Sequence, residues 1–123
     1  MKIIAEKITE SPKHALTIKD IKALVEVVPE EWIGQAHVFM LSAQRFENSK
    51  WDRPVIQNNT TFRILSRGFG RNEILLELLI ELAIRPNRIY PRYAHRLSTS
   101  QRKKLEEIVT PWYRKLIAKL DDA

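Results

Sequence analysis

The chain has 123 residues, of which 44% are hydrophobic and 29% are charged, a composition typical of one folded, water-soluble domain over residues 1–123. It contains no cysteine, which excludes disulfide bonds, thiolate metal sites and cysteine nucleophiles. The apolar stretch 74–84 is too short to span a membrane, and the N-terminal residues lack the apolar core of a signal peptide. We therefore expect a cytoplasmic protein that does not cross a membrane.

Motifs of several common enzyme classes are absent. The three glycines form neither GxGxxG nor GxxxxGK[ST], so nucleotide binding through these loops is excluded. No serine lies in a GxSxG motif, and no two of the three histidines have helical spacing. The sequence predicts no catalytic residue and no cofactor.

The first predicted helix follows Leu16. Thr17 has the position and chemistry of an N-cap, Asp20 occupies the third helical position, and Leu16 can pack onto Ile21 as a hydrophobic staple. Pro29 ends this helix, because it lacks a backbone N–H and restricts the residue before it.

Three short segments predict strands. The apolar run 37–41 indicates a buried strand, and residues 54–56 indicate a short edge strand. Residues 60–66 alternate, with Phe62 and Ile64 on one face and Thr61 and Arg63 on the other, which is typical of a half-buried strand.

A central helix is predicted from Glu73 to about Ile84, with Asn72 as its cap. Its apolar residues occupy most of the circumference, so we expect it to be packed on most sides. The polar exception is a stripe of residues spaced by four, which comprises Glu73, Glu77, Glu81 and Arg85.

The C-terminal region predicts two helices. Ser98 and Gln101 form a capping box for the first, and Thr110-Pro111 should break or kink it. Pro111 would then begin a final helix whose apolar residues either close the core or form a dimer seam. The predicted order of a helix, two or three strands, a central helix and C-terminal helices indicates an α+β fold.

This order resembles the minimal zincin-like metallopeptidase scaffold, in which an early helix and a short sheet precede an active-site helix carrying HExxH. The resemblance covers roughly residues 16–84. It places Glu77 and Glu81 at the positions of the two zinc-binding histidines, and Leu78 at the position of the catalytic glutamate. It therefore implies a pseudoenzyme, a scaffold without the zinc ligands and without the general base.

The glutamate stripe has three interpretations. We favour a solvated helix face, in which Glu81 and Arg85 form a pair four residues apart. Internal salt bridges to a basic segment are the second. A weak, hydrated divalent-metal site on Glu77 and Glu81 is the third.

Positive charge is concentrated in residues 85–120, which carry ten basic and two acidic side chains. Arginines alternate with tyrosines over 88–96, a pattern that suits phosphate contacts and base stacking. The alternatives are internal pairing with the glutamate stripe and a basic surface without a specific partner. The candidate residues for binding nucleic acid or an acidic protein are Arg88, Tyr90, Arg92, Tyr93, Arg96, Arg102 and Lys103.

Together these features predict a non-catalytic, zincin-like domain that acts as a binding or regulatory module. The alternative is a small basic nucleic-acid-binding protein that uses residues 85–120. A third hypothesis is a hydrolase that uses Glu77 and Glu81 with a bound ion.

Overall fold

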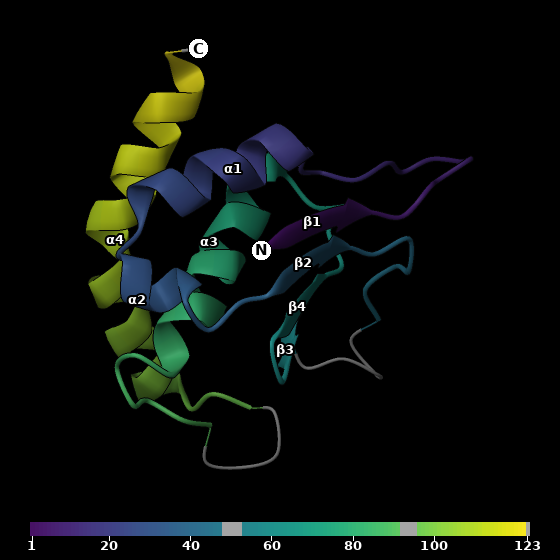
Figure 1. Ribbon diagram of the computed structural model, residues 1–123. Coiled ribbons are helices and arrows are strands. Elements are labelled where there is room, and N and C mark those ends of the chain that lie inside the picture. Colours follow the sequence, from purple (N-terminus) through teal and green to yellow (C-terminus); the bar gives the residue numbers. More distant parts are fainter. Residues whose placement is uncertain (48–52, 92–95, 123) are drawn as a thin grey trace.

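The computed structural model describes residues 1–47, 53–91 and 96–122 (Figure 1). The fold is α+β, as the sequence predicts. In chain order the elements are β1 (Lys2–Ala5), α1 (Ile18–Val27), α2 (Glu30–Ile33), β2 (Val38–Leu41), β3 (Val55–Asn58), β4 (Thr61–Ile64), α3 (Arg71–Ile84) and α4 (Thr99–Asp121).

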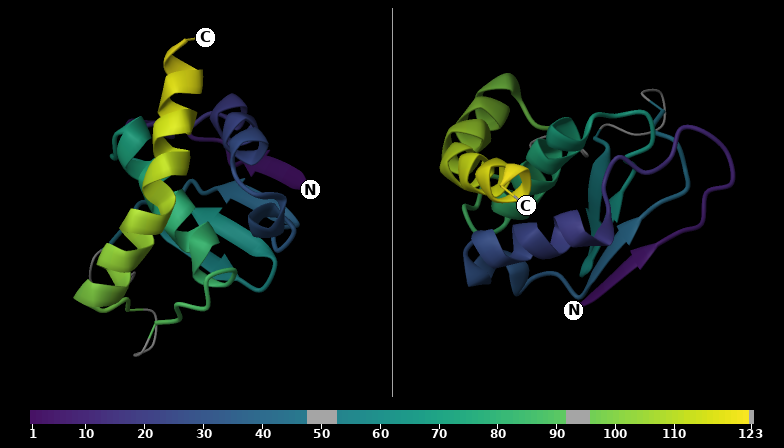
Figure 2. Two further views of the ribbon diagram at one scale, coloured as in Figure 1. Left: turned by 90° about the vertical axis from the view of Figure 1, so that its left-hand side faces the viewer. Right: turned by 90° about the horizontal axis from the view of Figure 1, so that it is seen from above.

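The strands form one mixed sheet in the order β1-β2-β4-β3. β1, β2 and β4 are parallel, and β3 is antiparallel to β4. Phe39 of β2 lies beside Phe62 of β4, and Leu41 lies beside Ile64, with all four side chains buried. Because successive side chains of a strand point to opposite faces, these residues define the core face of the sheet. Figure 2 shows the helices gathered on one side of the sheet.

The predicted strands are confirmed as β2, β3 and β4, and β3 is an edge strand as expected. The sheet nevertheless has four strands instead of two or three, because β1 joins its other edge. Three of the four β1 residues are exposed, so no apolar alternation marks this strand in the sequence. The short helix α2 was also not predicted, and it follows directly after Pro29.

Helix α1 matches its prediction closely. The Thr17 hydroxyl oxygen accepts a hydrogen bond from the Asp20 backbone N–H at 3.2 Å. The Asp20 carboxylate in turn accepts one from the Thr17 backbone N–H at 2.9 Å, which completes the capping box. The helix ends at Val27, two residues before Pro29.

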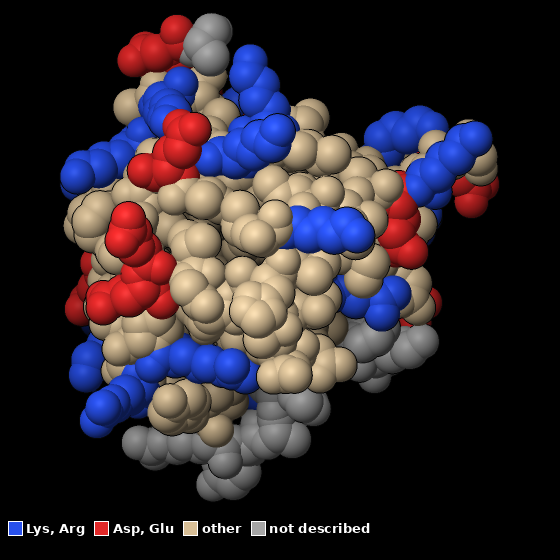
Figure 3. All heavy atoms as spheres, viewed as in Figure 1, with Lys and Arg blue, Asp and Glu red and all other residues tan. Residues whose placement is uncertain are grey.

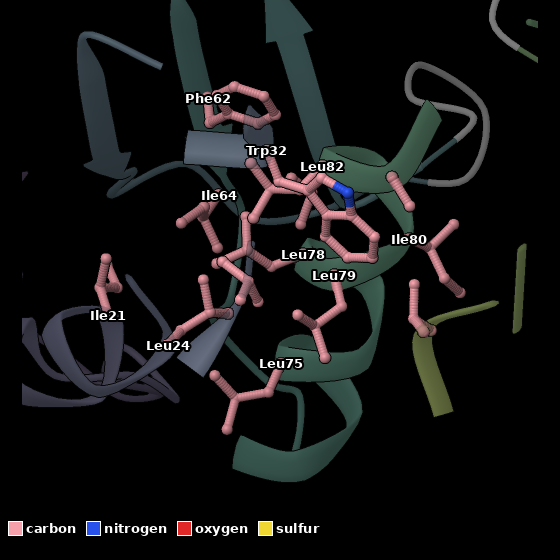
Figure 4. Packing of buried hydrophobic residues seen from close by; sticks show 14 of the residues in the cluster. Ile21, Leu24, Trp32, Phe62, Ile64, Leu75, Leu78, Leu79, Ile80 and Leu82 are labelled. Carbon is pink, nitrogen blue, oxygen red and sulfur yellow. The ribbon is translucent and has the colours of Figure 1, made fainter. Parts of the chain in front are cut away.

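Helix α3 forms the centre of the core. Figure 4 shows Leu75, Leu78 and Leu79 among buried side chains from α1, α2 and the sheet. The helix begins at Arg71, so Gly70 is its N-cap and the predicted cap Asn72 lies inside it. The reason is the carboxylate of Glu73, which accepts a hydrogen bond from the Gly70 N–H at 3.2 Å and thereby sets the cap three residues earlier.

Helix α4 is continuous over 23 residues, so the predicted break at Thr110-Pro111 is wrong. Leu105, Val109 and Leu116 are buried on both sides of the proline, and this packing outweighs the local cost of Pro111. Pro111 itself is exposed. The Thr110 hydroxyl donates a hydrogen bond to the Glu106 carbonyl oxygen at 2.6 Å, within the same turn.

These buried α4 side chains close the core against α3 and α1. The Trp112 ring meets the Trp32 ring edge to face, with centroids 6.1 Å apart. Within the part of the chain that the structure describes, no helix is long and apolar enough to cross a membrane.

Candidate functional site

The carboxylate of Glu81 is buried and holds an arginine. Glu81 is 3% exposed, and its Oε2 accepts a hydrogen bond from Arg53 Nε at 2.8 Å. Its Oε1 accepts a second bond from Arg53 Nη2 at 3.1 Å. This two-bond contact is the strong form of a carboxylate–guanidinium pair, and it joins the segment before β3 to α3.

Glu77, one helical turn earlier, holds a different arginine. Arg102 of α4 donates to Glu77 Oε1 at 2.5 Å and to Oε2 at 3.2 Å. The same guanidinium donates to Glu106 at 2.9 Å. Hydrogen bonding to Glu77 raises the pKa of Arg102 above its ordinary value, and burial opposes this shift. Arg102 therefore joins α3 to the first turns of α4.

The solvated-face interpretation of the glutamate stripe is thus wrong for its two central residues. The second interpretation, a salt bridge to the basic segment, is correct for Glu77, because its partner Arg102 lies within residues 85–120. The partner of Glu81 is Arg53, which lies outside that segment. The expected pairing of Glu81 with Arg85 is replaced by this contact, and Arg85 is exposed.

Of the three positions that the resemblance compares with HExxH, Leu78 and Glu81 are buried and Glu77 is half-buried. Leu78 is fully buried in the core, while both glutamates are bonded to arginines. Among the described residues, no group of three or more His, Cys, Asp or Glu side chains could hold a metal ion. A cation bound between Glu77 and Glu81 would have to displace one or both guanidinium groups.

The structure brings part of the predicted basic surface together. Arg88 and Tyr90 are exposed after α3, and with Lys104 of α4 they line a hollow of about 480 Å³. Tyr90 is 54% exposed. Figure 3 shows Lys and Arg side chains gathered over the turn after α3, next to acidic side chains over α2. Arg88 has a positive φ of 54°, an uncommon conformation for a residue other than glycine.

The remaining predicted residues lie in different settings. Lys103 is exposed and lines a second hollow, which it shares with Arg102. Arg96 is exposed and has an interaction partner of its own. Arg92 and Tyr93 lie outside the described residues.

Sequence reasoning missed two features of this region. Arg53 follows a polar segment, and no motif or periodicity connects it to Glu81, which lies 28 residues further along the chain. The second feature is a hollow of about 660 Å³ between α3 and α4, lined by Leu76 and by α4 residues such as Tyr113 and Ile117. The expected break at Pro111 concealed it, because the hollow follows α4 through that residue.

Comparisons of the chain with protein-family models, with curated proteins and with solved structures found no match in any of the three.

Proposed function

We propose that this chain is a non-catalytic binding module built on a zincin-like scaffold. The observation that supports it best is the burial of Leu78 together with the two-bond contact between Glu81 and Arg53. Strands β2, β3 and β4 follow α1 and precede α3, as in the resembled scaffold, whereas β1 precedes α1.

The chemistry of the motif positions supports a structural role for them. Zinc hydrolysis requires protein ligands, an open coordination position and a general base beside the bound water. Leucine cannot take up a proton, and a guanidinium paired with Glu81 occupies the space in which a cation would bind. Removing that guanidinium would leave a carboxylate buried without its counter-ion, which is unfavourable.

Zinc content tests this proposal. Tag-free protein should be equilibrated with equimolar zinc, dialysed and assayed by mass spectrometry, and we expect far less than one zinc per chain. The matched control is the double variant Glu77→His, Glu81→His, which introduces two histidines at helical spacing and should retain more zinc. Stoichiometric zinc in the unmodified protein would overturn the proposal.

Nucleic-acid binding is a second candidate, favoured by the hollow between Arg88, Tyr90 and Lys104. Two cations beside an exposed tyrosine suit the phosphates and bases of a single strand. Fluorescence anisotropy with labelled single-stranded RNA, from about 50 to 200 mM salt, should show binding that weakens steeply with salt.

Charge reversal then localises that binding. Arg88→Glu and Lys104→Glu should each weaken it, and Lys22→Glu, an exposed lysine on α1, is the matched control. Equal effects of the three variants, or no binding at the lowest salt, would remove this candidate.

A further inference from the structure

The hollow between α3 and α4, here called the α3–α4 groove, has an extended shape. It is lined by Leu76 on one side and by α4 residues from Glu106 to Ala118 on the other. Along α4 the lining positions are Glu106, Thr110, the pair Tyr113 and Arg114, and the pair Ile117 and Ala118. They recur at intervals of three or four residues, so the groove follows one face of the helix for about three turns, or about 18 Å. Leu76, Tyr113 and Ile117 are half-buried and contribute its apolar surface.

Ion pairs hold the two walls together at opposite ends. Arg71 at the start of α3 pairs with Asp121 at the end of α4, at 2.7 Å. Glu77 pairs with Arg102 near the start of α4. The buried side chains of α4 also pack against α3, so a ligand would not need to separate the helices. A preformed site avoids part of the entropic cost of binding.

The shape of the groove favours a helical ligand. An amphipathic helix presents apolar residues at intervals of three and four along one side, and such a stripe fits an apolar groove of this length. The volume of about 660 Å³ accommodates several side chains.

The charge around the groove favours an acidic ligand. Glu106 is already paired with Arg102, whereas Arg114 is exposed and makes no ion pair with a described residue. The sequence of α4 contains six basic and three acidic side chains, and two of the basic ones, Arg102 and Lys119, are paired within the protein. An acidic partner would therefore be attracted to α4 and would find its counter-charge at Arg114.

We propose that the α3–α4 groove binds an acidic amphipathic helix of a partner protein. Apolar side chains of that helix would contact Leu76, Tyr113 and Ile117, and a carboxylate would pair with Arg114. This inference rests on the proposed function as a binding module and adds the class of partner.

A pair of synthetic peptides tests the chemistry. The probe is a stapled, fluorescein-labelled helix of about 16 residues, with leucines along one side and glutamates flanking them. The control peptide has lysine in place of each glutamate. We expect the acidic peptide to bind with a dissociation constant in the micromolar range and the basic peptide to bind at least about tenfold more weakly. No binding of the acidic peptide, or equal binding of both, would overturn the proposal.

Two charge reversals on the same helix test the location. Arg114→Glu places a repelling charge at the groove, whereas Lys104→Glu makes the same change at the separate hollow beside Arg88. Both side chains are exposed, so both variants should fold. We expect Arg114→Glu to weaken the acidic peptide by about tenfold and Lys104→Glu by less than about twofold. Equal losses would mean diffuse attraction to a basic protein and would overturn the site.

The same samples separate the other possible occupants. If sedimentation equilibrium shows a dimer that Ile117→Ser dissociates, a second copy of this chain fills the groove and the proposal is wrong. If labelled RNA competes with the peptide and loses affinity in Arg114→Glu, the groove binds nucleic acid and the proposal is again wrong. Stoichiometric zinc would overturn the non-catalytic function and would leave the peptide result standing on its own.

Discussion

Helices α3 and α4 lie side by side (Figure 2), but α3 is mostly buried, whereas 11 of the 23 residues of α4 are exposed. Of the 14 residues of α3, nine are buried, and one of these is the charged residue Glu81. Of the 23 residues of α4, three are buried. Packing therefore determines most of the sequence of α3, whereas α4 also has an exposed face that can contact other molecules.

The charges of the two helices differ in the same way. The acidic groups of α3 all act within the protein, since Glu73 caps the helix while Glu77 and Glu81 hold arginines. On α4 the exposed side chains include Lys103, Lys104 and Arg114. The comparison indicates that α3 organises the fold, and the binding surfaces proposed above are formed largely by α4.

Truncating one leucine on each helix should reveal the largest difference. Leu78→Ala on α3 removes a fully buried side chain, and we expect a loss of about 3 to 4 kcal/mol in the free energy of unfolding. Leu120→Ala near the end of α4 removes a half-buried one, and the loss should be about 1 kcal/mol or less. Urea denaturation followed by circular dichroism measures both. Equal losses would mean that α4 is as deeply integrated in the core as α3.

The two glutamates of α3 offer a comparison within one helix. Glu81→Gln removes a carboxylate charge that is 4% exposed and makes two hydrogen bonds with Arg53, and it should cost about 2 to 3 kcal/mol. Glu77→Gln should cost about 1 kcal/mol, because Arg102 is 38% exposed and keeps Glu106. Thermal unfolding of both variants tests this order. A larger loss from Glu77→Gln would mean that the ion pair between Glu77 and Arg102 of α4 stabilises the fold more than the ion pair between Glu81 and Arg53.

A substitution at Pro111 tests how strongly packing keeps α4 continuous. The proline has no N–H for the carbonyl of Glu107, and Pro111→Ala supplies one at an exposed position. We expect a gain of about 1 to 2 kcal/mol in the free energy of unfolding. This is less than the full cost of proline in a helix interior, because alanine also increases the conformational entropy of the unfolded chain. Unchanged or lower stability in urea would show that the proline itself favours this helix geometry.

The same proline explains where sequence reasoning about the fold succeeded and failed. The helix caps at Thr17 and Ser98 could be predicted from the sequence, because each cap depends on residues three apart in the chain. The continuity of α4 could not be predicted from the sequence, because it depends on contacts of Leu105, Val109 and Leu116 with distant segments. The exposed strand β1 failed for a similar reason, since only its pairing with β2 identifies it.

The candidate site also has parts that could be predicted from the sequence and parts that depend on contacts between distant residues. Charge counts located the basic region that contains Arg88, Tyr90 and Lys103, and these residues are exposed. Charge counts could not separate exposed cations from the paired Arg102, because its partner Glu77 lies 25 residues away. The burial of Glu81 could not be predicted either, because a buried glutamate and a solvent-exposed one can both recur every four residues along a helix.

The smallest expected effect concerns the surface contact between α4 and α1. A hydrogen bond from Lys119, together with its charge, lowers the pKa of Glu26 below 4.5, and burial opposes this only weakly. A carboxylate whose pKa is lower in the folded state stabilises the fold above its unfolded pKa and loses that contribution as the pH falls through the folded value. Glu26→Gln should therefore be slightly less stable than the unmodified protein at neutral pH, and the difference should vanish well below pH 4.5.

Exposure limits this contribution, because water and salt screen both partners. The matched control is Glu107→Gln on α4, which removes an exposed carboxylate that pairs with no described residue, so its effect should not follow the same pH course. Melting temperatures of the three proteins from about pH 7 to pH 3, at low salt and at about 1 M salt, measure this. A difference for Glu26→Gln that persists at the lowest pH would mean that this residue supports α1 by packing, and that the ion pair with Lys119 contributes nothing measurable.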